Sequence, residues 1–256
     1  MRLHPGYEQR PNDPNFIDCV KTPLTEEEAT YYLKTAWKKI YGIYPSINSL
    51  ALLWAQSCGE TGRWKLLRCN NWGNIKRRKN DHTLKWTSYD AGEVLADGKH
   101  HMFYPYHPQT HFAAWENPLD GAEYYIRFLS GRKRYKKAWI EVMIGDPITY
   151  CAELKKAGYF TADLQHYTKG VVSLTNEFKR KAERLMAWEP PQLPINEPTK
   201  PPTEPVIESD PIPSEHVVDV VKPDSRPITE VPFKEESKKN FWQVIINFLK
   251  KLFNGR

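Results

Sequence analysis

The stretch that most constrains the fold is SINSLALLWAQSCGETGRWKLLRCNNWGNIK, which covers residues 46–76. Ser46 suits a helix N-cap, and apolar residues follow it at the three-and-four spacing of a buried helical face. These residues are Leu50, Leu53, Trp54 and Cys58. Gly59 and Gly62 are typical of the end of a helix. We therefore expect a central, largely buried helix that ends near residue 60.

Glu60 stands at the end of this predicted helix and beside its buried face, because it comes seven residues after Leu53. Partial burial raises the pKa of a carboxyl group, and the negative end of the helix dipole acts in the same direction. A glycosidase needs such a carboxyl as its general acid, since the glycosidic oxygen must be protonated as the bond breaks. Taken alone, a glutamate at such a position is far more typical of a solvated residue at a frayed helix end.

The segment that follows, CNNWGNIK, is short, irregular and rich in amide side chains. Amides supply hydrogen-bond partners, and a tryptophan supplies an apolar platform for a sugar ring. We therefore predict a substrate-binding wall beside Glu60. Its candidate residues are Asn70, Asn71, Trp72 and Asn74.

Together, AQSCGETGRW and NNWGNIK resemble two signatures of the glucosaminidase family typified by the flagellar muramidase domain, within the lysozyme-like superfamily. These signatures are AQ-x-x-x-E-[ST]-G-x-[GW] and N-N-[LW]-[FG]-x-I-K. THFAAWENPLDGAEYYIRFL and KKAGYFTADLQHY are similar to two further segments of that family, so the resemblance covers about residues 25–188. It implies a peptidoglycan glycosidase that cleaves the N-acetylglucosamine/N-acetylmuramic acid backbone. Glu60 is the implied general acid, and Tyr159 and Tyr167 are implied to bind substrate.

A second catalytic group is expected after Lys76. The family places an acid in a T-x-E-Y-x-x-G segment, to which TSYDAG is similar, so Asp90 and Glu93 are the candidates. Both are also common turn residues. Two other mechanisms stay open: attack by the substrate's own acetamido group, oriented by Tyr159 and Asn71, or attack by its 6-hydroxyl, as in a lytic transglycosylase. The absence of a G-L-M-Q-type run after Glu60 favours the glucosaminidase branch.

The fold expected for residues 25–188 is α+β and lysozyme-like, a mainly helical domain with a small β-hairpin lobe. Thr25 and Glu28 form a T-x-x-E capping box for a helix that ends at Gly42. Later helices are expected over residues 117–131, 135–144, 146–158 and 167–188. Residues 76–115 carry turn signals at 90–92 and 97–98, which predict the hairpin lobe over the cleft.

No metal or cofactor is expected. His100, His101, His107 and His111 match no familiar metal-site spacing, and the cysteines at positions 19, 58, 69 and 151 include no C-x-x-C pair. Cys58 and Cys69 flank Glu60, and they are candidates for a disulfide in an exported chain. Free thiols are expected in a chain made in a reducing compartment.

The flanking regions differ from this domain in composition. Residues 1–24 form a Pro-rich polar arm, and residues 189–236 form a Pro-rich acidic linker of extended character. In residues 237–256, apolar residues fall on one helical face and lysines and asparagines on the other, which predicts a cationic amphipathic helix. We expect this helix to contact an anionic membrane surface or a groove in a virion protein. Its contact residues are Phe241, Trp242, Ile245, Phe248, Leu249 and Leu252.

The net charge of +6 fits an anionic partner such as the cell wall or a membrane surface. The basic residues are scattered and form no recognition motif, so nucleic acid is not an expected partner. The N-terminus lacks a secretory signal pattern. We expect synthesis in the cytoplasm and action on the wall after holin-type release or as a virion component, as for a bacteriophage lysin. The alternative function is a non-catalytic virion structural or wall-binding module, anchored through its C-terminal helix.

Overall fold

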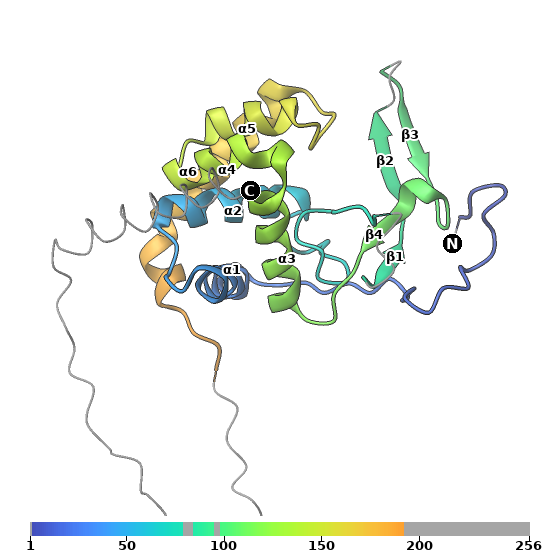
Figure 1. Ribbon diagram of the computed structural model, residues 1–256, viewed down its shortest axis with the longest axis horizontal. Helices are drawn as coiled ribbons and strands as arrows, with labels where there is room; N and C mark the ends of the chain where they lie inside the picture. The colour runs from blue at the N-terminus through green and yellow to red at the C-terminus, as the bar shows by residue number, and fades with distance from the viewer. Residues whose placement is uncertain (1, 79–83, 95–97, 192–256) are drawn as a thin grey trace, which may run out of the picture. The chain divides into compact units, whose positions relative to one another are not determined.

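A computed structural model describes residues 2–78, 84–94 and 98–191 of the chain, and Figure 1 shows a helical body beside a lobe of short strands. The predicted C-terminal helix and its contact residues lie outside the described residues, as does the predicted linker from residue 192 onward. Within the described part, the mainly helical α+β architecture predicted from the sequence is confirmed.

The helical body contains every helix that the sequence predicts within the described residues. These helices are α1 (Glu26–Tyr41), α2 (Ile47–Glu60), α3 (Pro118–Gly131), α4 (Lys136–Ile144), α5 (Pro147–Lys156) and α6 (Leu164–Ala187), with a short 3-10 turn η2 (Lys133–Tyr135) before α4. Helix α6 begins three residues earlier than predicted, because the Asp163 side chain caps it by accepting a hydrogen bond from the His166 amide. Among the described helices, none combines the length and the apolar character needed to cross a membrane.

Helix α2 lies at the centre of this body and packs against α1, α4 and α6. All of its residues from 49 to 58 are buried, as expected for a helix that is apolar over most of its surface. Trp54 is fully buried, and its ring centroid lies 4.9 Å from that of Trp64 and 5.4 Å from that of Phe178 on α6. Each such side chain contributes about 2 kcal/mol on burial, so the position of α2 is firmly fixed.

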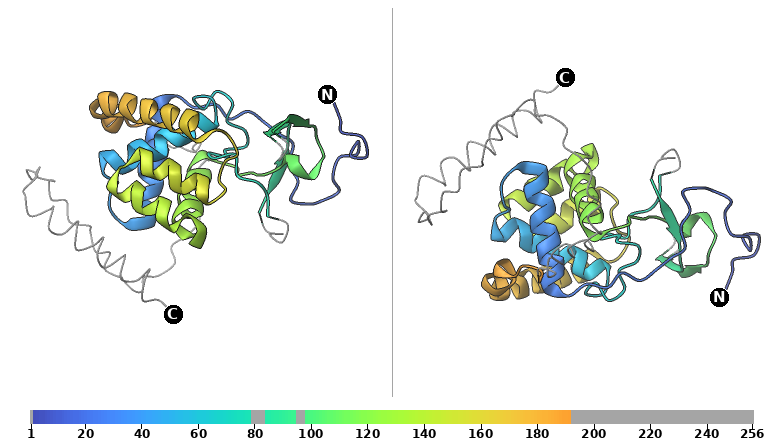
Figure 2. Two further views of the ribbon diagram at one scale, coloured as in Figure 1. Left: turned by 90° about the horizontal axis from the view of Figure 1, so that it is seen from above. Right: turned by 90° about the horizontal axis from the view of Figure 1, so that it is seen from below.

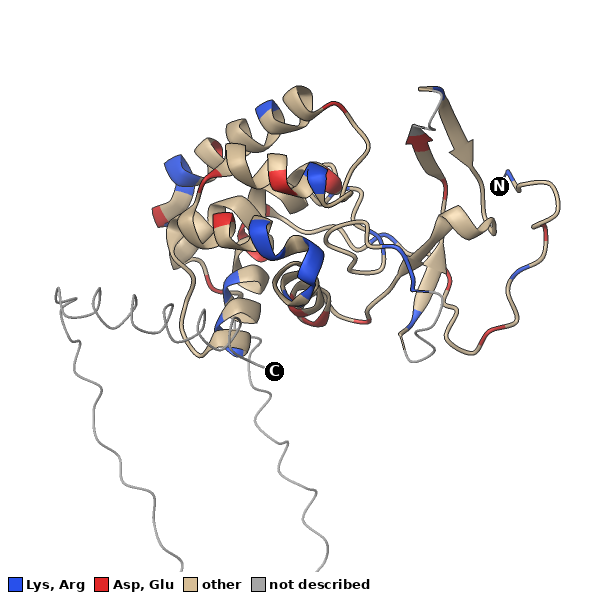
Figure 3. Cartoon of the chain, turned by 45° about the horizontal axis from the view of Figure 1, so that its top comes forward, with Lys and Arg blue, Asp and Glu red and all other residues tan. Residues whose placement is uncertain are grey.

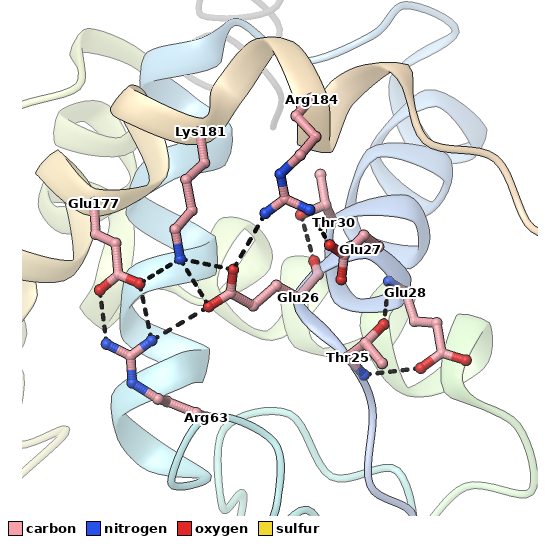
Figure 4. Close-up of polar contacts among 9 residues, drawn as sticks. All are labelled: Thr25, Glu26, Glu27, Glu28, Thr30, Arg63, Glu177, Lys181 and Arg184. Atoms are coloured by element: carbon pink, nitrogen blue, oxygen red, sulfur yellow. Dashed lines mark hydrogen bonds and ion pairs between the residues drawn. The ribbon is translucent and has the colours of Figure 1, made fainter.

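Helices α1 and α6 are joined by ion pairs, and Figure 4 also shows the cap at the start of α1. Thr25 and Glu28 form the predicted capping box at the start of α1, and Gly42 ends the helix with a φ of 77°. Lys181 on α6 contacts Glu26 on α1 at 2.8 Å. Figure 3 shows that basic and acidic residues are interspersed along the helices, which permits many such pairs.

The lobe consists of two small antiparallel sheets. Strand β1 (Trp86–Ser88) pairs with β4 (His111–Ala113), and β2 (Ala91–Val94) pairs with β3 (His100–Phe103), while a 3-10 turn η1 (Pro108–Thr110) precedes β4. The hairpin is therefore formed by β2 and β3. The predicted turn at residues 90–92 is wrong, because Ala91 and Gly92 belong to β2 and Gly92 lies opposite Met102.

The four histidines of this region are spread over the lobe. His100 and His101 lie on β3, His107 caps η1, and His111 lies on β4. Among the described residues, no group of three or more His, Cys, Asp or Glu side chains is arranged to hold a metal ion.

The N-terminal arm lies along the lobe, as the two views of Figure 2 show. The ring centroid of Phe16 lies 4.9 Å from that of Trp86, and Phe16 is buried. Asp13 Oδ2 accepts hydrogen bonds from Trp86 Nε1 at 3.0 Å and from the Arg77 guanidinium at 2.8 Å. The arm is therefore an integral part of the lobe, although it forms no regular element of its own.

Candidate active site

A cleft with a volume of about 530 Å³ is lined by residues of both the helical body and the lobe. The lobe forms one wall of the cleft, with residues 89–93 and with Phe112 of β4. The loop between α5 and α6, residues 158–162, forms the other wall together with Tyr167. Figure 1 shows the hairpin and this loop facing each other. Glu60, Gly73, Asn74 and Lys76 complete the lining.

Glu60 is the last residue of α2 and is partly buried where the helix reaches the cleft. Tyr167 Oη donates a hydrogen bond of 2.9 Å to Glu60 Oε1. Burial raises the pKa of the Glu60 carboxyl to about 7, against the opposite effect of hydrogen bonds from Tyr167 and Asn74. A large fraction of the carboxyl groups therefore keeps its proton near neutral pH and is able to donate it.

Asn74 connects the end of α2 to the lobe. Its Nδ2 donates to the backbone oxygen of Glu60 at 2.6 Å, and its Oδ1 accepts from Tyr89 Oη at 3.1 Å. Tyr89 in turn stacks on Phe112, with ring centroids 4.1 Å apart. The left-handed backbone of Asn74, with a φ of 47°, is tolerated better by asparagine than by most residues. Asn74 thus lines the cleft and also holds Glu60 in place.

Tyr159 and Tyr167 stand on the opposite side of the cleft. Tyr159 Oη donates to the backbone oxygen of Gly73 at 3.1 Å, and a Cβ atom at position 73 would lie 2.7 Å from that hydroxyl. The glycine of the NNWGNIK motif therefore permits this close approach. Phe160 stacks on Tyr167 with ring centroids 3.8 Å apart. The stacked rings give this side an apolar surface with polar tips, which suits a sugar ring.

Asp90 and Glu93 both line the cleft from the hairpin side, as their candidacy requires. Glu93 lies on β2 opposite His101, and Lys76 Nζ is 3.0 Å from Glu93 Oε1. The same ammonium group lies 4.1 Å from the centroid of the Phe112 ring. Asp90 is exposed between β1 and β2. Glu93 is therefore held in place by a sheet and a cation, whereas Asp90 lies outside the strands and forms no ion pair with the described residues.

Asn70, Asn71 and Trp72 are buried and do not line the cleft. Asn71 Nδ2 donates to the backbone oxygens of Ile75 and Ala113, each at 2.9 Å. Asn70 Nδ2 and Trp72 Nε1 also donate to backbone oxygens, at 3.0 Å each. The prediction that these three side chains contact substrate is therefore wrong, because their polar atoms are used to shape the loop that carries Asn74.

Tyr89 and Phe160 are cleft residues that the sequence analysis did not select. Each is the direct neighbour of a selected residue, since Tyr89 precedes Asp90 in TSYDAG and Phe160 follows Tyr159 in KKAGYF. Their position inside these two motifs was the available signal. TSYDAG and KKAGYF therefore each contribute one more aromatic residue to the cleft than expected.

Comparison with known families decides the classification. The glucosaminidase family model, described as mannosyl-glycoprotein endo-beta-N-acetylglucosaminidase, matches residues 33–180. The chain belongs to the glucosaminidase family. The matched part of the chain includes all of the cleft residues named above, and the predicted α+β fold, mainly helical with a small hairpin lobe, agrees with the observed elements.

The solved structures that are similar to this chain have low sequence identity to it. A mutant of a peptidoglycan hydrolase from Sphingomonas sp. A1 is 19% identical with a TM-score of 0.49, and the match covers 62% of this chain and 97% of that one. The catalytic domain of the autolysin Auto from Listeria monocytogenes is 17% identical with a TM-score of 0.41, over 62% of this chain and 88% of that one. A comparison with curated protein sequences finds no match.

Proposed function

We propose that this glucosaminidase is a peptidoglycan glycosidase in which Glu60 is the general acid. The observation that carries the proposal is a carboxyl group with a pKa of about 7 at the end of a buried helix, lining a cleft and hydrogen-bonded by Tyr167. Such a group donates its proton to the glycosidic oxygen as the bond to carbon one breaks. The leaving sugar then departs as a neutral alcohol.

The cleft supports a sugar polymer as the substrate. Its volume of about 530 Å³ lies in the range of roughly 300–1,000 Å³ common for binding sites, and aromatic rings line both of its sides. The stacked pairs Tyr89–Phe112 and Phe160–Tyr167 offer apolar faces and edges to sugar rings. Peptidoglycan is the glycan proposed because the motifs around Glu60 and Asn74 resemble those of flagellar muramidase domains.

We propose Glu93 as the second carboxylate, with Asp90 as the alternative. Glu93 reaches the cleft from the hairpin, so it would approach the sugar from a different element than Glu60. Lys76 Nζ lies 3.0 Å from Glu93 Oε1 and holds this side chain in position at the cleft. In that role Glu93 stabilises the oxocarbenium-like transition state or activates the attacking water.

The proposal is tested with purified peptidoglycan and the full chain. The wild type and Glu183→Gln, an exposed substitution on α6, should release soluble muropeptides, while Glu60→Gln should lower the rate by about 10²-fold or more. Mass spectrometry of the products assigns the bond cut and separates hydrolysed from anhydro ends, the latter pointing to a lytic transglycosylase. No sugar release at any pH would favour a non-catalytic wall-binding or virion module instead.

The choice between the two hairpin acids is tested by comparing Glu93→Gln with Asp90→Asn under the same conditions. A large fall in kcat for Glu93→Gln, with a small change for Asp90→Asn, supports the assignment. Equal and small effects of both substitutions would favour attack by the acetamido group of the substrate, which needs no second carboxylate.

We further propose that residues 237–256 bring the enzyme to an anionic membrane after phage-directed release, on the basis of their cationic amphipathic pattern. Removal of residues 233–256 should leave the rate on purified wall unchanged and lower clearing of whole cells. Sedimentation with vesicles that contain anionic lipid tests the membrane contact directly, and binding to a virion protein in the absence of vesicle binding would contradict it.

A further inference from the structure

Two cysteines that are far apart in the sequence meet where the N-terminal arm passes the loop that leads to the cleft. Cys19 and Cys69 are 50 positions apart. An antiparallel bridge between Lys21 and Arg68, and a hydrogen bond of 2.9 Å from the Cys69 amide to the Val20 oxygen, bring the two segments side by side. The two thiols are close enough for each to shift the pKa of the other.

The surroundings of the two sulfur atoms make them chemically different. Cys19 is partly exposed, and Arg68 Nη1 lies 3.7 Å from its Sγ, whereas Cys69 is buried and its Sγ accepts a hydrogen bond of 3.4 Å from the Val20 amide. The hydrogen bond with Cys69 and the charge of Arg68 lower the pKa of Cys19, and the pKa of Cys69 is raised. Cys19 is therefore the accessible thiol with thiolate character, which is the nucleophile in thiol–disulfide exchange.

The other two cysteines lack these features. Cys58 and Cys151 are buried in the helical body, where burial raises the pKa of Cys58 to about 12 and that of Cys151 to about 11. Such thiols are poorly reactive. The disulfide between Cys58 and Cys69 that the sequence leaves open is disfavoured, because Cys58 packs in the helical core and Cys69 packs against the arm.

We propose that Cys19 and Cys69 form a thiol–disulfide site that is closed by a small-molecule disulfide such as oxidised glutathione. The Cys19 thiolate attacks one sulfur of this oxidant, which forms a mixed disulfide and releases one thiol. The pKa of Cys69 is raised mainly by its interaction with the Cys19 thiol, and this effect ends when Cys19 is part of the mixed disulfide. Cys69 then gives up its proton and attacks the Cys19 sulfur, so that the intramolecular S–S bond forms and the second thiol leaves with that proton. Two cysteine thiols are oxidised and one small disulfide is reduced to two thiols.

Closure ties the arm to the segment that continues into Asn70, Asn71 and Asn74. Because the bond closes a loop of about 50 residues, it lowers the entropy of the unfolded chain and stabilises the folded one. For a domain of this size, we expect the thermal midpoint of the oxidised form to lie about 5–10 °C above that of the reduced form.

The full chain is treated with oxidised glutathione or with a reductant, the remaining thiols are blocked by alkylation in denaturant, and tryptic peptides are mapped without reduction. We expect a linked pair made of the peptide that ends at Lys21 and the peptide of residues 69–76, with Cys58 and Cys151 alkylated as internal controls. Cys19→Ser should abolish the linked pair and the rise in thermal midpoint.

Three results would overturn the proposal. One is stable glutathione on Cys19 with Cys69 alkylated in the same molecule, since the second thiol would then fail to reach the first. Another is a linked pair that includes Cys58 or Cys151. The third is a linked pair of Cys19 and Cys69 without any change in the thermal midpoint, since the bond would then not restrain the unfolded chain.

Discussion

Glu60→Gln separates the chemistry of the carboxyl group from its effect on stability. The substitution keeps the size of the side chain and an oxygen that accepts the hydrogen bond from Tyr167, but it removes the charge. Because burial raises the folded-state pKa from an ordinary 4.5 to about 7, the contribution of Glu60 to stability is fully present below pH 4.5 and is lost as the pH rises from 4.5 through 7. Glutamine has no proton to lose, so the variant lacks this decline.

The size of the effect follows from that rise in pKa. A change from 4.5 to about 7 corresponds to roughly 3 kcal/mol, at about 1.4 kcal/mol for each tenfold change in proton affinity. Glu60 lines a cleft and is only partly buried, so solvent screening reduces this value. We therefore expect Glu60→Gln to gain about 1–3 kcal/mol of unfolding free energy relative to the wild type between pH 4 and pH 8.

Urea unfolding of both proteins at pH 4, 6 and 8 measures this gain, since the pH dependence of all other groups cancels in the difference. Glu183→Gln, which lies exposed on α6, serves as the control and should differ from the wild type by the same small amount at each pH. A difference between Glu60→Gln and the wild type that stays constant from pH 4 to pH 8 would refute the reasoning. The Glu60 carboxyl would then titrate as an ordinary exposed acid, and it would be ionised at neutral pH and unable to act as the proton donor.

Tyr167→Phe removes a hydrogen bond that lowers the pKa of Glu60, so the basic limb of the kcat/KM profile should move to higher pH by up to about one unit; an unmoved limb would contradict this. Hydrogen bonds from Arg63 lower the pKa of Glu177 to about 2, so its contribution to stability is present above pH 4.5 and is lost as the pH falls toward 2. Glu177→Gln should cost about 1–2 kcal/mol at pH 7 and little at pH 2, measured by urea unfolding. Asn71→Ala removes three buried hydrogen bonds and should lower the unfolding free energy by about 2–4 kcal/mol. The KM, measured well below the thermal midpoint of the variant, should change little. A selective rise in KM would instead indicate that Asn71 binds substrate directly.

The sequence is informative about α2 and Glu60 because the relevant signals are local. The spacing of the apolar residues fixes which face of α2 is buried, and the glycines at 59 and 62 fix where the helix ends, within one or two residues. The acid at the end therefore has to lie at the border of core and solvent. The raised pKa of Glu60 in the structure is the physical consequence that this placement predicts.

The roles of the amides in the loop of residues 69–76 are harder to predict, because a buried amide and a substrate-binding amide look the same in a sequence. Asn71 and Asn74 are three residues apart in one motif, yet one is enclosed among backbone groups and the other lines the cleft. What separates them is the path of the loop, which depends on Ala113 in β4 and on Tyr89. Those contacts come from segments more than ten residues away, so no local pattern encodes them.

Helix α6 contributes more to the site than the sequence predicts. Tyr167, in its first turn, is the only residue of this helix that the sequence predicts to belong to the site. Tyr167 near the start of α6 holds the carboxyl group of Glu60, and Glu177, further along the same helix, holds Arg63 through contacts at 2.6 and 2.9 Å. Arg63 follows Glu60 by three residues and has a left-handed backbone with a φ of 55°. Helix α6 thus fixes both the side chain of the acid and the turn that ends α2. Because α6 contacts both the Glu60 carboxyl and the turn after it, the position of this carboxyl depends on how α6 packs against α2.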